Sequence, residues 1–308
     1  MSSITSPRYR RLRWLLIALF VLLTAGASSA AAPAAPGAEA RTEHVIIISV
    51  DGLRPDAIDR FAPQTIRGLI DEGSYSSEAT TILPSKTLPS HTSMLTGVKP
   101  KAHGVYWNRR QMDEHGHITT PTVFAAARAA GLRTAAFFSK AKFEHLAIPG
   151  ALDHAYVPGG VTGRSRAENT ALHVENYLAH TQPNLLFVHF GEPDFAGHVF
   201  GWMSAPYGVA VRLADRQLRE LLSAADRAFG SGNYTVILTS DHGGHGRGHG
   251  SDDPRDVTIP WVAWGEAVRP GAALLPVRTV DTAATALWLL GVPIDASVAG
   301  RAVAEAFE

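Results

Sequence analysis

The chain of 308 residues contains no cysteine, which excludes both disulfides and thiolate metal sites. It also has no net charge, because 28 Lys and Arg residues balance 28 Asp and Glu residues. Without an excess of positive charge, we expect no binding of a nucleic-acid polymer through bulk electrostatics. With 45% hydrophobic and 18% charged residues, the composition fits one ordinary globular domain with a large core.

The N-terminal region lacks a long hydrophobic run. Its apolar stretch, from Trp14 to Leu23, is shorter than the roughly 20 residues that a membrane span needs. This stretch follows a basic segment and precedes Ala-rich sequence, which is typical of a cleavable signal peptide. We predict a signal peptide at 1–32, a flexible linker at 33–43 and one domain at 44–308. The protein is then periplasmic or secreted, with no stable span after cleavage; an uncleaved anchor is the alternative.

Histidine, in contrast, is abundant, with 14 residues, several of them beside aspartate. The segment 239–250 reads Thr-Ser-Asp-His-Gly-Gly-His-Gly-Arg-Gly-His-Gly. It follows the apolar run 234–238, which predicts a buried parallel strand that delivers Asp241 and His242 to the edge where open α/β sheets place ligands. Asp and neutral His are common zinc ligands, and glycines let a backbone fold tightly around an ion. Taken alone, the segment fits a flexible loop equally well.

Two other apolar runs end in similar chemistry. The run 44–50 is followed at once by Asp51 and Gly52, which form either a simple turn or a carboxylate site at a sheet edge. After the run 184–190, Asp194 and His198 stand four residues apart, so one face of a helical turn carries both. Alone, this pair is weak evidence for a metal site. It is much stronger evidence when it faces a second strand end that carries Asp and His, as Asp241 and His242 do.

A hydroxyl and an amide complete the set of candidates. Thr87 begins a short predicted helix that Gly97 ends, and a helix N-terminus favours a bound anion or an alkoxide on Thr87 itself. Thr87 could instead merely cap the helix, and Ser85 and Ser90 are rival hydroxyls. Asn108, in the next loop, could donate its amide to a phosphate oxygen or serve as a turn residue.

The remaining pattern alternates strands and helices. We predict helices at 62–72, 122–130, 166–180, 207–229 and 280–290, strands at 133–139 and 257–264, and a surface excursion at 143–165. Such alternation indicates an α/β fold with a doubly wound, mostly parallel central sheet and helices on both faces. No second domain boundary is visible.

Together the strand ends offer Asp and His ligands and one hydroxyl, as a two-metal hydrolytic site requires. Six motifs in this order resemble the alkaline phosphatase superfamily, and most of all its nucleotide pyrophosphatase/phosphodiesterase branch. The motifs are Val50-Asp51-Gly52, Lys86-Thr-Leu-Pro-Ser-His91, His103 through Asn108, Glu192 through His198, Ser240-Asp-His-Gly243 and His249-Gly-Ser-Asp252. The resemblance runs from about residue 44 to the end of the chain and implies an alkaline-phosphatase-like fold.

The resemblance also implies a site for two divalent ions, and the carboxylate and imidazole ligands favour Zn²⁺. The implied ligands are Asp194, His198 and His249 for one ion, and Asp51, Asp241, His242 and Thr87 for the other. Asn108 and the Thr87 N–H would bind a phosphoryl oxygen of a small phosphorylated substrate. Thr87 would attack phosphorus, and water would then hydrolyse the phospho-threonine.

Several points stay open from the sequence. His245 could replace His249 as the third ligand. Leu88 and His189 stand where nucleotide-cleaving relatives carry aromatic residues, which argues against a stacked nucleobase. Other side chains could border the substrate, either as an aromatic wall or as charges near the outer oxygens. These are Trp107, Trp202 and Tyr207, for which packing is the alternative, and Lys86, Lys140 and Lys142.

Other functions fit the same residues less completely. A phosphodiesterase is the first expectation, and a phosphomonoesterase or phosphonate hydrolase of the same superfamily is the alternative. A sulfatase would need a C/S-x-P-x-R motif, which is absent. A catalytically silent binding protein would be expected to have lost at least one of the ligands, and a metal-buffering protein would need neither Thr87 nor Asn108.

Overall fold

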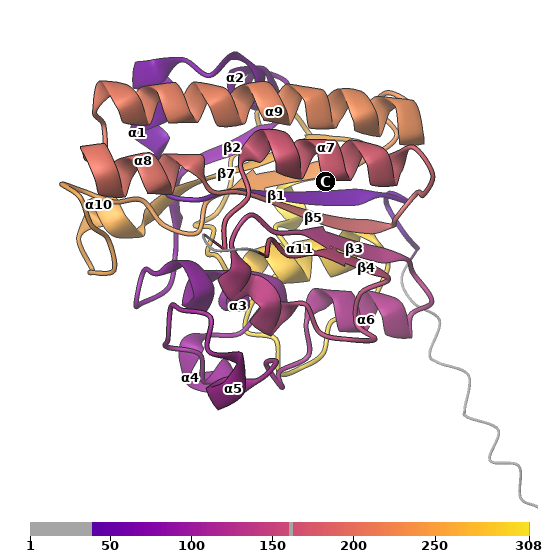
Figure 1. Ribbon diagram of the computed structural model, residues 1–308. Coiled ribbons are helices and arrows are strands. Elements are labelled where there is room, and N and C mark those ends of the chain that lie inside the picture. The colour runs from indigo at the N-terminus through magenta and orange to yellow at the C-terminus, as the bar shows by residue number, and fades with distance from the viewer. Residues whose placement is uncertain (1–38, 160–162, 308) are drawn as a thin grey trace, which may run out of the picture. The chain divides into compact units, whose positions relative to one another are not determined.

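A seven-stranded sheet forms the centre of the computed structural model, which describes residues 39–159 and 163–307 (Figure 1). The strands lie in the order β2-β7-β6-β1-β5-β3-β4. Their bounds are β1 (Val45–Val50), β2 (Ser74–Thr80), β3 (Thr134–Phe137), β4 (His154–Tyr156), β5 (Leu185–Phe190), β6 (Thr235–Thr239) and β7 (Thr258–Gly265). The predicted signal peptide lies outside the described residues.

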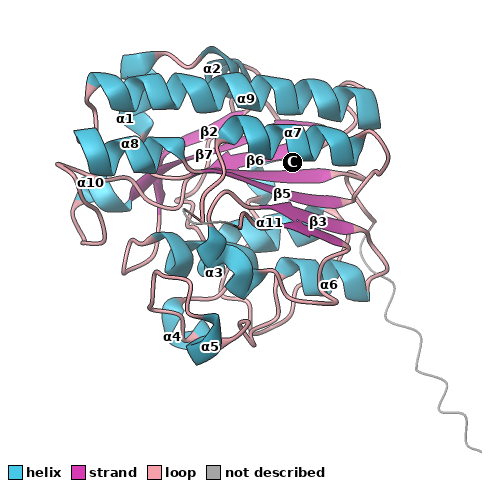
Figure 2. Cartoon of the chain, in the orientation of Figure 1, coloured by secondary structure: helices cyan, strands magenta, loops and turns pink. Residues whose placement is uncertain are grey.

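Helices cover both faces of this sheet (Figure 2). The α-helices are α1 (Pro55–Phe61), α2 (Gln64–Asp71), α3 (Thr87–Thr96), α4 (Pro100–His103), α5 (Met112–His115), α6 (Val123–Ala129), α7 (Ala167–Leu178), α8 (Glu192–Phe200), α9 (Ala205–Phe229), α10 (Pro254–Val257) and α11 (Asp281–Leu289). Two 3₁₀ turns are η1 (Ala141–Leu146) and η2 (Ala304–Ala306). None of the helices in the described ranges is long and apolar enough to cross a membrane.

The apolar runs form strands because both of their faces are covered. In β1, Ile47 faces the core beneath α3, α6 and α11, whereas Ile46 and Ile48 face the core beneath α1, α2, α7, α8 and α9. Every residue of β1, β5 and β6 is buried. Parallel strands buried on both faces read as continuous hydrophobic runs, which is the pattern that the sequence shows.

The predicted fold class is confirmed. Strands β6, β1, β5, β3 and β4 run parallel to one another. The two remaining strands are antiparallel, β7 to β6 and β2 to β7. Strand β7 reverses because the chain returns from β6 through a loop and one turn of helix, whereas a parallel partner needs a longer crossover.

The local predictions are confirmed only in part. The helix predicted at 62–72 is α2 (Gln64–Asp71), whereas α1 ahead of it was not predicted; Ala62, which takes a left-handed conformation (φ 47°), and Pro63 separate the two helices. Strand β2 was not predicted, since Ser74–Thr80 carries few apolar residues at this sheet edge. The surface excursion at 143–165 is wrong in part, because Phe143 and Leu146 are fully buried and β4 extends the sheet.

Some residues of the predicted linker pack against the domain. Within the predicted linker 33–43, the structure describes residues 39–43. The backbone N–H of Arg41 donates to the carbonyl of Leu289 at 2.7 Å. Thr42 is buried, and its hydroxyl donates to Glu266 at 2.7 Å. The end of this segment is therefore fastened to the domain.

Candidate active site

Three neighbouring parallel strands bring the candidate residues to one edge of the sheet. Asp51 follows β1, and Asp241 with His242 follows β6. Asp194 and His198 lie on α8, which starts directly after β5. The order β6-β1-β5 therefore sets Asp51 between the other two carboxylates. This edge is where open α/β sheets bind ligands.

Gly52 allows the segments that follow β1 and β5 to approach each other. Its φ is +75°, which L side chains rarely adopt, and an added Cβ would lie 3.0 Å from the Cα of Asp194. The backbone N–H of Asp194 donates to the carbonyl of Asp51 at 2.9 Å. The Asp-Gly pair is thus more than a turn, because the missing side chain brings two carboxylates together.

One group of side chains is fully buried. His242 Nε2 lies 3.1 Å from Asp241 Oδ2 and 3.5 Å from Asp51 Oδ1. The hydroxyl of Thr87 lies 3.4 Å from the same nitrogen. All four side chains have at most 1% of their surface exposed. We call Asp51, Asp241, His242 and Thr87 the buried group.

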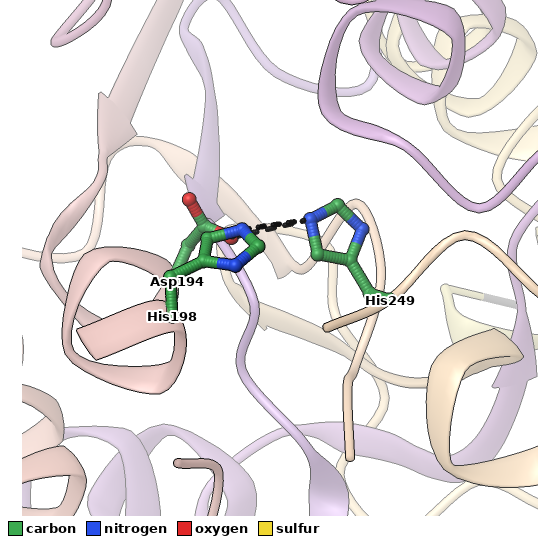
Figure 3. A group of neighbouring side chains, drawn as sticks. All are labelled: Asp194, His198 and His249. Carbon is green, nitrogen blue, oxygen red and sulfur yellow. Dashed lines mark hydrogen bonds and ion pairs between the residues drawn. The ribbon is translucent and has the colours of Figure 1, made fainter. Parts of the chain in front are cut away.

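A second group lies nearer the surface (Figure 3). His198 Nε2 lies 3.2 Å from Asp194 Oδ1 and 3.2 Å from His249 Nε2, and the third distance, His249 Nε2 to Asp194 Oδ1, is 3.5 Å. The side chain of His198 is 42% exposed, whereas Asp194 and His249 are at most 5% exposed. We call Asp194, His198 and His249 the rim group. The two groups adjoin, since the rings of His242 and His249 stack at 3.6 Å.

The facing atoms of both groups are lone-pair donors. The Nδ1 atoms of His198, His242 and His249 each contact a backbone carbonyl, at 2.8–3.0 Å. A carbonyl only accepts, so each Nδ1 carries the hydrogen and each neutral ring offers the lone pair of Nε2. Three buried carboxylate oxygens meet them without a hydrogen bond from any described residue: Asp51 Oδ1, Asp194 Oδ1 and Asp241 Oδ2. Lone pairs that converge in this way fit a bound cation, and such carbonyl contacts orient metal-binding imidazoles.

Lys140, at the end of β3, neutralises the other side of these carboxylates. Its ammonium donates to Asp51 Oδ2 and to Asp194 Oδ2, each at 2.6 Å, and is itself buried. His189 Nε2 approaches the same Asp51 oxygen at 2.9 Å and is held by Ser139 at 2.6 Å. Lys140 thus ties the buried group to the rim group and leaves one oxygen of each carboxylate unpaired.

The neighbouring charges and the burial of the site shift the pKa values of its residues, some upward and some downward. Burial would raise the pKa of Asp51, but Lys140 and then His189 hold it well below its usual value. Burial would lower the pKa of His242, yet the carboxylates, Asp241 first, raise it to about 9. Burial and the neighbouring His242 lower the pKa of His249 to about 4, so that this ring is neutral at pH 7. The buried group therefore demands positive charge, as a proton or as a metal ion.

Thr87 is the first residue of α3, as predicted. His91, one turn later, is held between the Thr87 carbonyl at Nδ1 and the Ser49 hydroxyl at Nε2, each at 2.8 Å. Burial lowers the pKa of His91 to about 4, so the ring stays neutral. The N-terminal turn of α3 is thereby fastened to β1, beside the buried carboxylates.

Asn108 lies beside this turn. Its Oδ1 accepts hydrogen bonds from the Leu88 N–H at 2.9 Å and from the Lys142 ammonium at 3.0 Å. Because both partners are donors, they fix the orientation of the amide and leave its NH₂ group for another acceptor. This is the orientation that donation to a phosphoryl oxygen would require.

Two choices left open by the sequence have clear geometric outcomes. His249 lies in the rim group, while His245 Nδ1 contacts Asp256 Oδ1 at 2.7 Å instead. Leu88 and His189 are both fully buried, and neither presents a face on which a nucleobase could stack.

The three candidates for an aromatic wall pack within the protein. The Trp202 N–H and the Tyr207 hydroxyl both donate to the Gly52 carbonyl, at 3.0 and 2.8 Å, and both rings are buried. The half-buried Trp107 stacks on His115 at 3.8 Å. Trp202 and Tyr207 therefore support the turn that carries Asp51, which is the packing role considered as the alternative.

The bridging role of Lys140 and the contact of His189 with Asp51 were missed from the sequence. A signal existed for each residue. His189 is a polar residue inside an apolar run, and Lys140 follows a strand that ends at the same sheet edge.

Comparison with known proteins identifies the family. Residues 45–247, more than half of the chain, match the family described as type I phosphodiesterase / nucleotide pyrophosphatase. The chain belongs to this family. The predicted resemblance is therefore confirmed.

The relatives with curated names are distant in sequence, as two of them show. The chain is 25% identical to bis(5′-adenosyl)-triphosphatase of Xenopus laevis over 66% of its length and 47% of that protein. It is 25% identical to ectonucleotide pyrophosphatase/phosphodiesterase family member 7 of Homo sapiens, over 72% of its length and 53% of that protein. The chain thus spans about half the length of these two relatives.

Solved structures agree on the fold. Murine ectonucleotide pyrophosphatase/phosphodiesterase 5, solved as an inactive variant in complex with AMP, has a TM-score of 0.68 at 17% identity, covering 82% of this chain and 96% of that one. A 2-O GAG sulfatase has the same TM-score at 14% identity, covering 86% and 74%. The architecture is alkaline-phosphatase-like, and this likeness in fold does not by itself imply a shared function.

Proposed function

We propose that this chain is a secreted two-metal phosphohydrolase that cleaves phosphodiester or pyrophosphate bonds through a phospho-threonine on Thr87. Residues 44–308 would form the catalytic domain and residues 1–32 a cleaved signal peptide. Membership of the type I phosphodiesterase family supports the reaction class. The observation that carries the proposal is the convergence of unpaired carboxylate oxygens and imidazole lone pairs beside the Thr87 hydroxyl.

The donor set suits two divalent cations, and we propose Zn²⁺. Asp194, His198 and His249 of the rim group would hold one, and Asp51, Asp241, His242 and Thr87 of the buried group the other. When bound, two such cations stabilise the charge on the attacking and leaving oxygens of an in-line displacement. The absence of thiolates and the Asp and His ligands favour zinc over softer metals.

The protein's own groups would bind and orient the phosphoryl group. Thr87 stands at the N-terminus of α3, where the helix dipole favours an alkoxide and where its backbone N–H would donate to an incoming anion. Asn108 would donate its oriented amide to a non-bridging oxygen. Attack by Thr87 Oγ1 would form a new P–O bond and expel one group of the substrate, an alcohol from a diester or a phosphate from a pyrophosphate, which takes up the proton that Thr87 loses. The phospho-threonine keeps the other ester group, and water would then restore the Thr87 hydroxyl and release a phosphate monoester.

The experiment that tests this proposal compares wild type with Thr87→Ala on bis-p-nitrophenyl phosphate and on p-nitrophenyl phosphate. The variant should lose turnover while its metal content, measured by elemental analysis, stays at two equivalents. Undiminished turnover in Thr87→Ala would disprove the mechanism. A preference for the monoester would keep the Thr87 mechanism and move the protein to the second candidate, a phosphomonoesterase, which the extra charge of Lys142 beside Asn108 would suit.

A further inference from the structure

A cavity of about 850 Å³ is lined in part by Asn108. Its charged lining residues are Arg109, Arg110, Lys140, Lys142, Glu144 and Arg164. Five of these six side chains are cationic. Two residues, Asn108 and Lys140, belong both to this lining and to the candidate active site, so the cavity is continuous with that site.

Two of the five cations are already paired. Lys140 is held by Asp51 and Asp194, and Arg110 lies 2.5 Å from Glu144. The other three, Arg109, Lys142 and Arg164, form no ion pair with any carboxylate in the described part of the chain. Arg164 instead lies over the ring of Phe195, at 5.0 Å. The cavity therefore carries three uncompensated positive charges.

Lys142 is the innermost of the three. Its ammonium is largely buried and donates to Asn108 Oδ1 at 3.0 Å. Burial and then the neighbouring Lys140 lower the pKa of Lys142 to about 8, and a bound anion would favour its charged form. Asn108 in turn accepts a hydrogen bond from the N–H of Leu88, the residue next to Thr87. Only the side chain of Asn108 would therefore separate an anion beside Lys142 from the phosphoryl group.

The exposed cations stand farther out on the same cavity. Arg109 directly follows Asn108 in the chain, and Arg164 lines the same cavity; both side chains are exposed. Guanidinium groups pair with carboxylates and phosphates through two parallel hydrogen bonds. Because Arg109 and Arg164 form no ion pair with a described residue, their N–H groups are available for such a pair. The positions that could have stacked a nucleobase, Leu88 and His189, are buried. Charge rather than stacking is thus the recognition chemistry that borders the site.

We propose that Lys142, Arg109 and Arg164 form a subsite for a second anionic group of the substrate, a carboxylate or a phosphate on the organic part of the ester. The preferred substrates are then phosphate esters that carry such a group. This inference rests on the proposed function, because it assigns the substrate class of the same active site.

The test uses three symmetric chromogenic diesters, so that either ester group can enter the subsite. These are bis(4-nitrophenyl) phosphate, bis(3-carboxy-4-nitrophenyl) phosphate and the analogue with a 3-phosphonomethyl group. Wild type should show a higher kcat/KM for at least one of the charged diesters than for the neutral one, by about tenfold or more. The double variant Arg109→Ala/Arg164→Ala should lose this preference and keep its activity on the neutral diester.

The control variant is Arg212→Ala/Arg216→Ala, which removes the same charge from exposed positions on α9. It should retain the preference. A preference for the carboxylate or for the phosphonate identifies which anion the subsite takes. Equal kcat/KM for all three diesters in wild type, or equal loss on the neutral and the charged diesters in the arginine variant, would overturn the proposal.

Equilibrium binding separates this inference from the proposed function. The Thr87→Ala protein should bind the charged diester about tenfold more tightly than the neutral one, and the added arginine substitutions should abolish the difference. If wild type hydrolyses none of the diesters while this binding difference persists, the proposed function fails and the subsite stands. If wild type hydrolyses all of them without discrimination and binding is equal, only the subsite fails.

Discussion

The buried group and the rim group offer nearly the same atoms in different surroundings. Asp51, Asp241 and His242 stand on the ends of two central strands and are inaccessible to solvent. The rim group combines a helical turn on α8 with a glycine-rich loop, and His198 is 42% exposed. The backbone of the sheet holds the first group, whereas hydrogen bonds to loop carbonyls hold the second. The two groups thus differ in their exposure to solvent and in what holds them, and we expect them to bind a metal ion with different strength.

The largest effect is expected from the buried group. Asp51→Asn removes a charge that faces both His242 and Lys140, and it should lower kcat on bis-p-nitrophenyl phosphate by at least about a thousandfold, since several kcal/mol of transition-state stabilisation are lost. Elemental analysis should find one metal equivalent fewer, with the rim ion retained. Loss of both ions together would mean that the two groups form one cooperative site.

A substitution of the bridging lysine tests the link between the groups. Lys140→Met leaves two buried carboxylates without their common counter-ion, so the metal-free protein should lose roughly 3–5 kcal/mol in its free energy of unfolding. Added metal should recover most of this loss, because cations then compensate the same carboxylates. Denaturant unfolding with and without chelator measures both quantities.

Lys142→Met is the matched control for that experiment. Lys142 is also largely buried but pairs with an amide rather than a carboxylate, so its removal leaves no charge behind. The metal-free stability should change much less than in Lys140→Met. Equal losses in the two variants would show that packing, not charge compensation, explains the effect.

The rim group can be broken at one histidine. His249→Ala should reduce the metal content by one equivalent and turnover by about a hundredfold or more. Loss of a residue that only orients a metal ligand costs roughly 10–100-fold in metal affinity or activity, and the loss of a ligand itself should cost more. His245→Ala should keep both ions, since His245 contacts Asp256 instead. The reverse result in these two variants would reassign the third ligand.

The smallest effect concerns the order of metal loss. Under limiting chelator at pH 7, the rim ion should leave first, because the exposure of His198 gives water and chelator access. The release of metal is followed with a chromogenic indicator, and the order is established by repeating the titration on Asp51→Asn, which should show only the fast phase. A single phase in wild type would remove the distinction between the two groups.

Local sequence was sufficient for the residues that follow parallel strands. Asp51, Asp194 and Asp241 were predicted as site residues because a continuous apolar run indicates a buried strand. The residues that follow the run lie at the carboxyl end of that strand, where such sheets bind ligands. His198 followed from the four-residue helical spacing. The role of these residues as ligands remains a prediction, but their placement together is a property of the structure.

Other features depended on contacts between distant segments. His249 rather than His245 enters the rim group because its Nδ1 meets the carbonyl of Ser85, far away in the chain. Lys140 reaches Asp51 across the end of β5, because the sheet order β3-β5-β1 separates the segments that follow β3 and β1 by one strand only. The edge strand β2 was missed because its pairing with β7, not its own composition, makes it a strand.

The sequence by itself determined the α/β fold, the sheet edge that carries the site and most of the candidate ligands, because hydrophobic runs and their boundaries are local properties. Tertiary structure alone decided which charges neutralise one another. Lys140 forms ion pairs with two carboxylates, whereas Lys142, two residues later, lines a cavity with other cationic side chains. Electrostatic pairing acts through space over a few ångströms, and spacing along the chain does not report which groups lie within that distance.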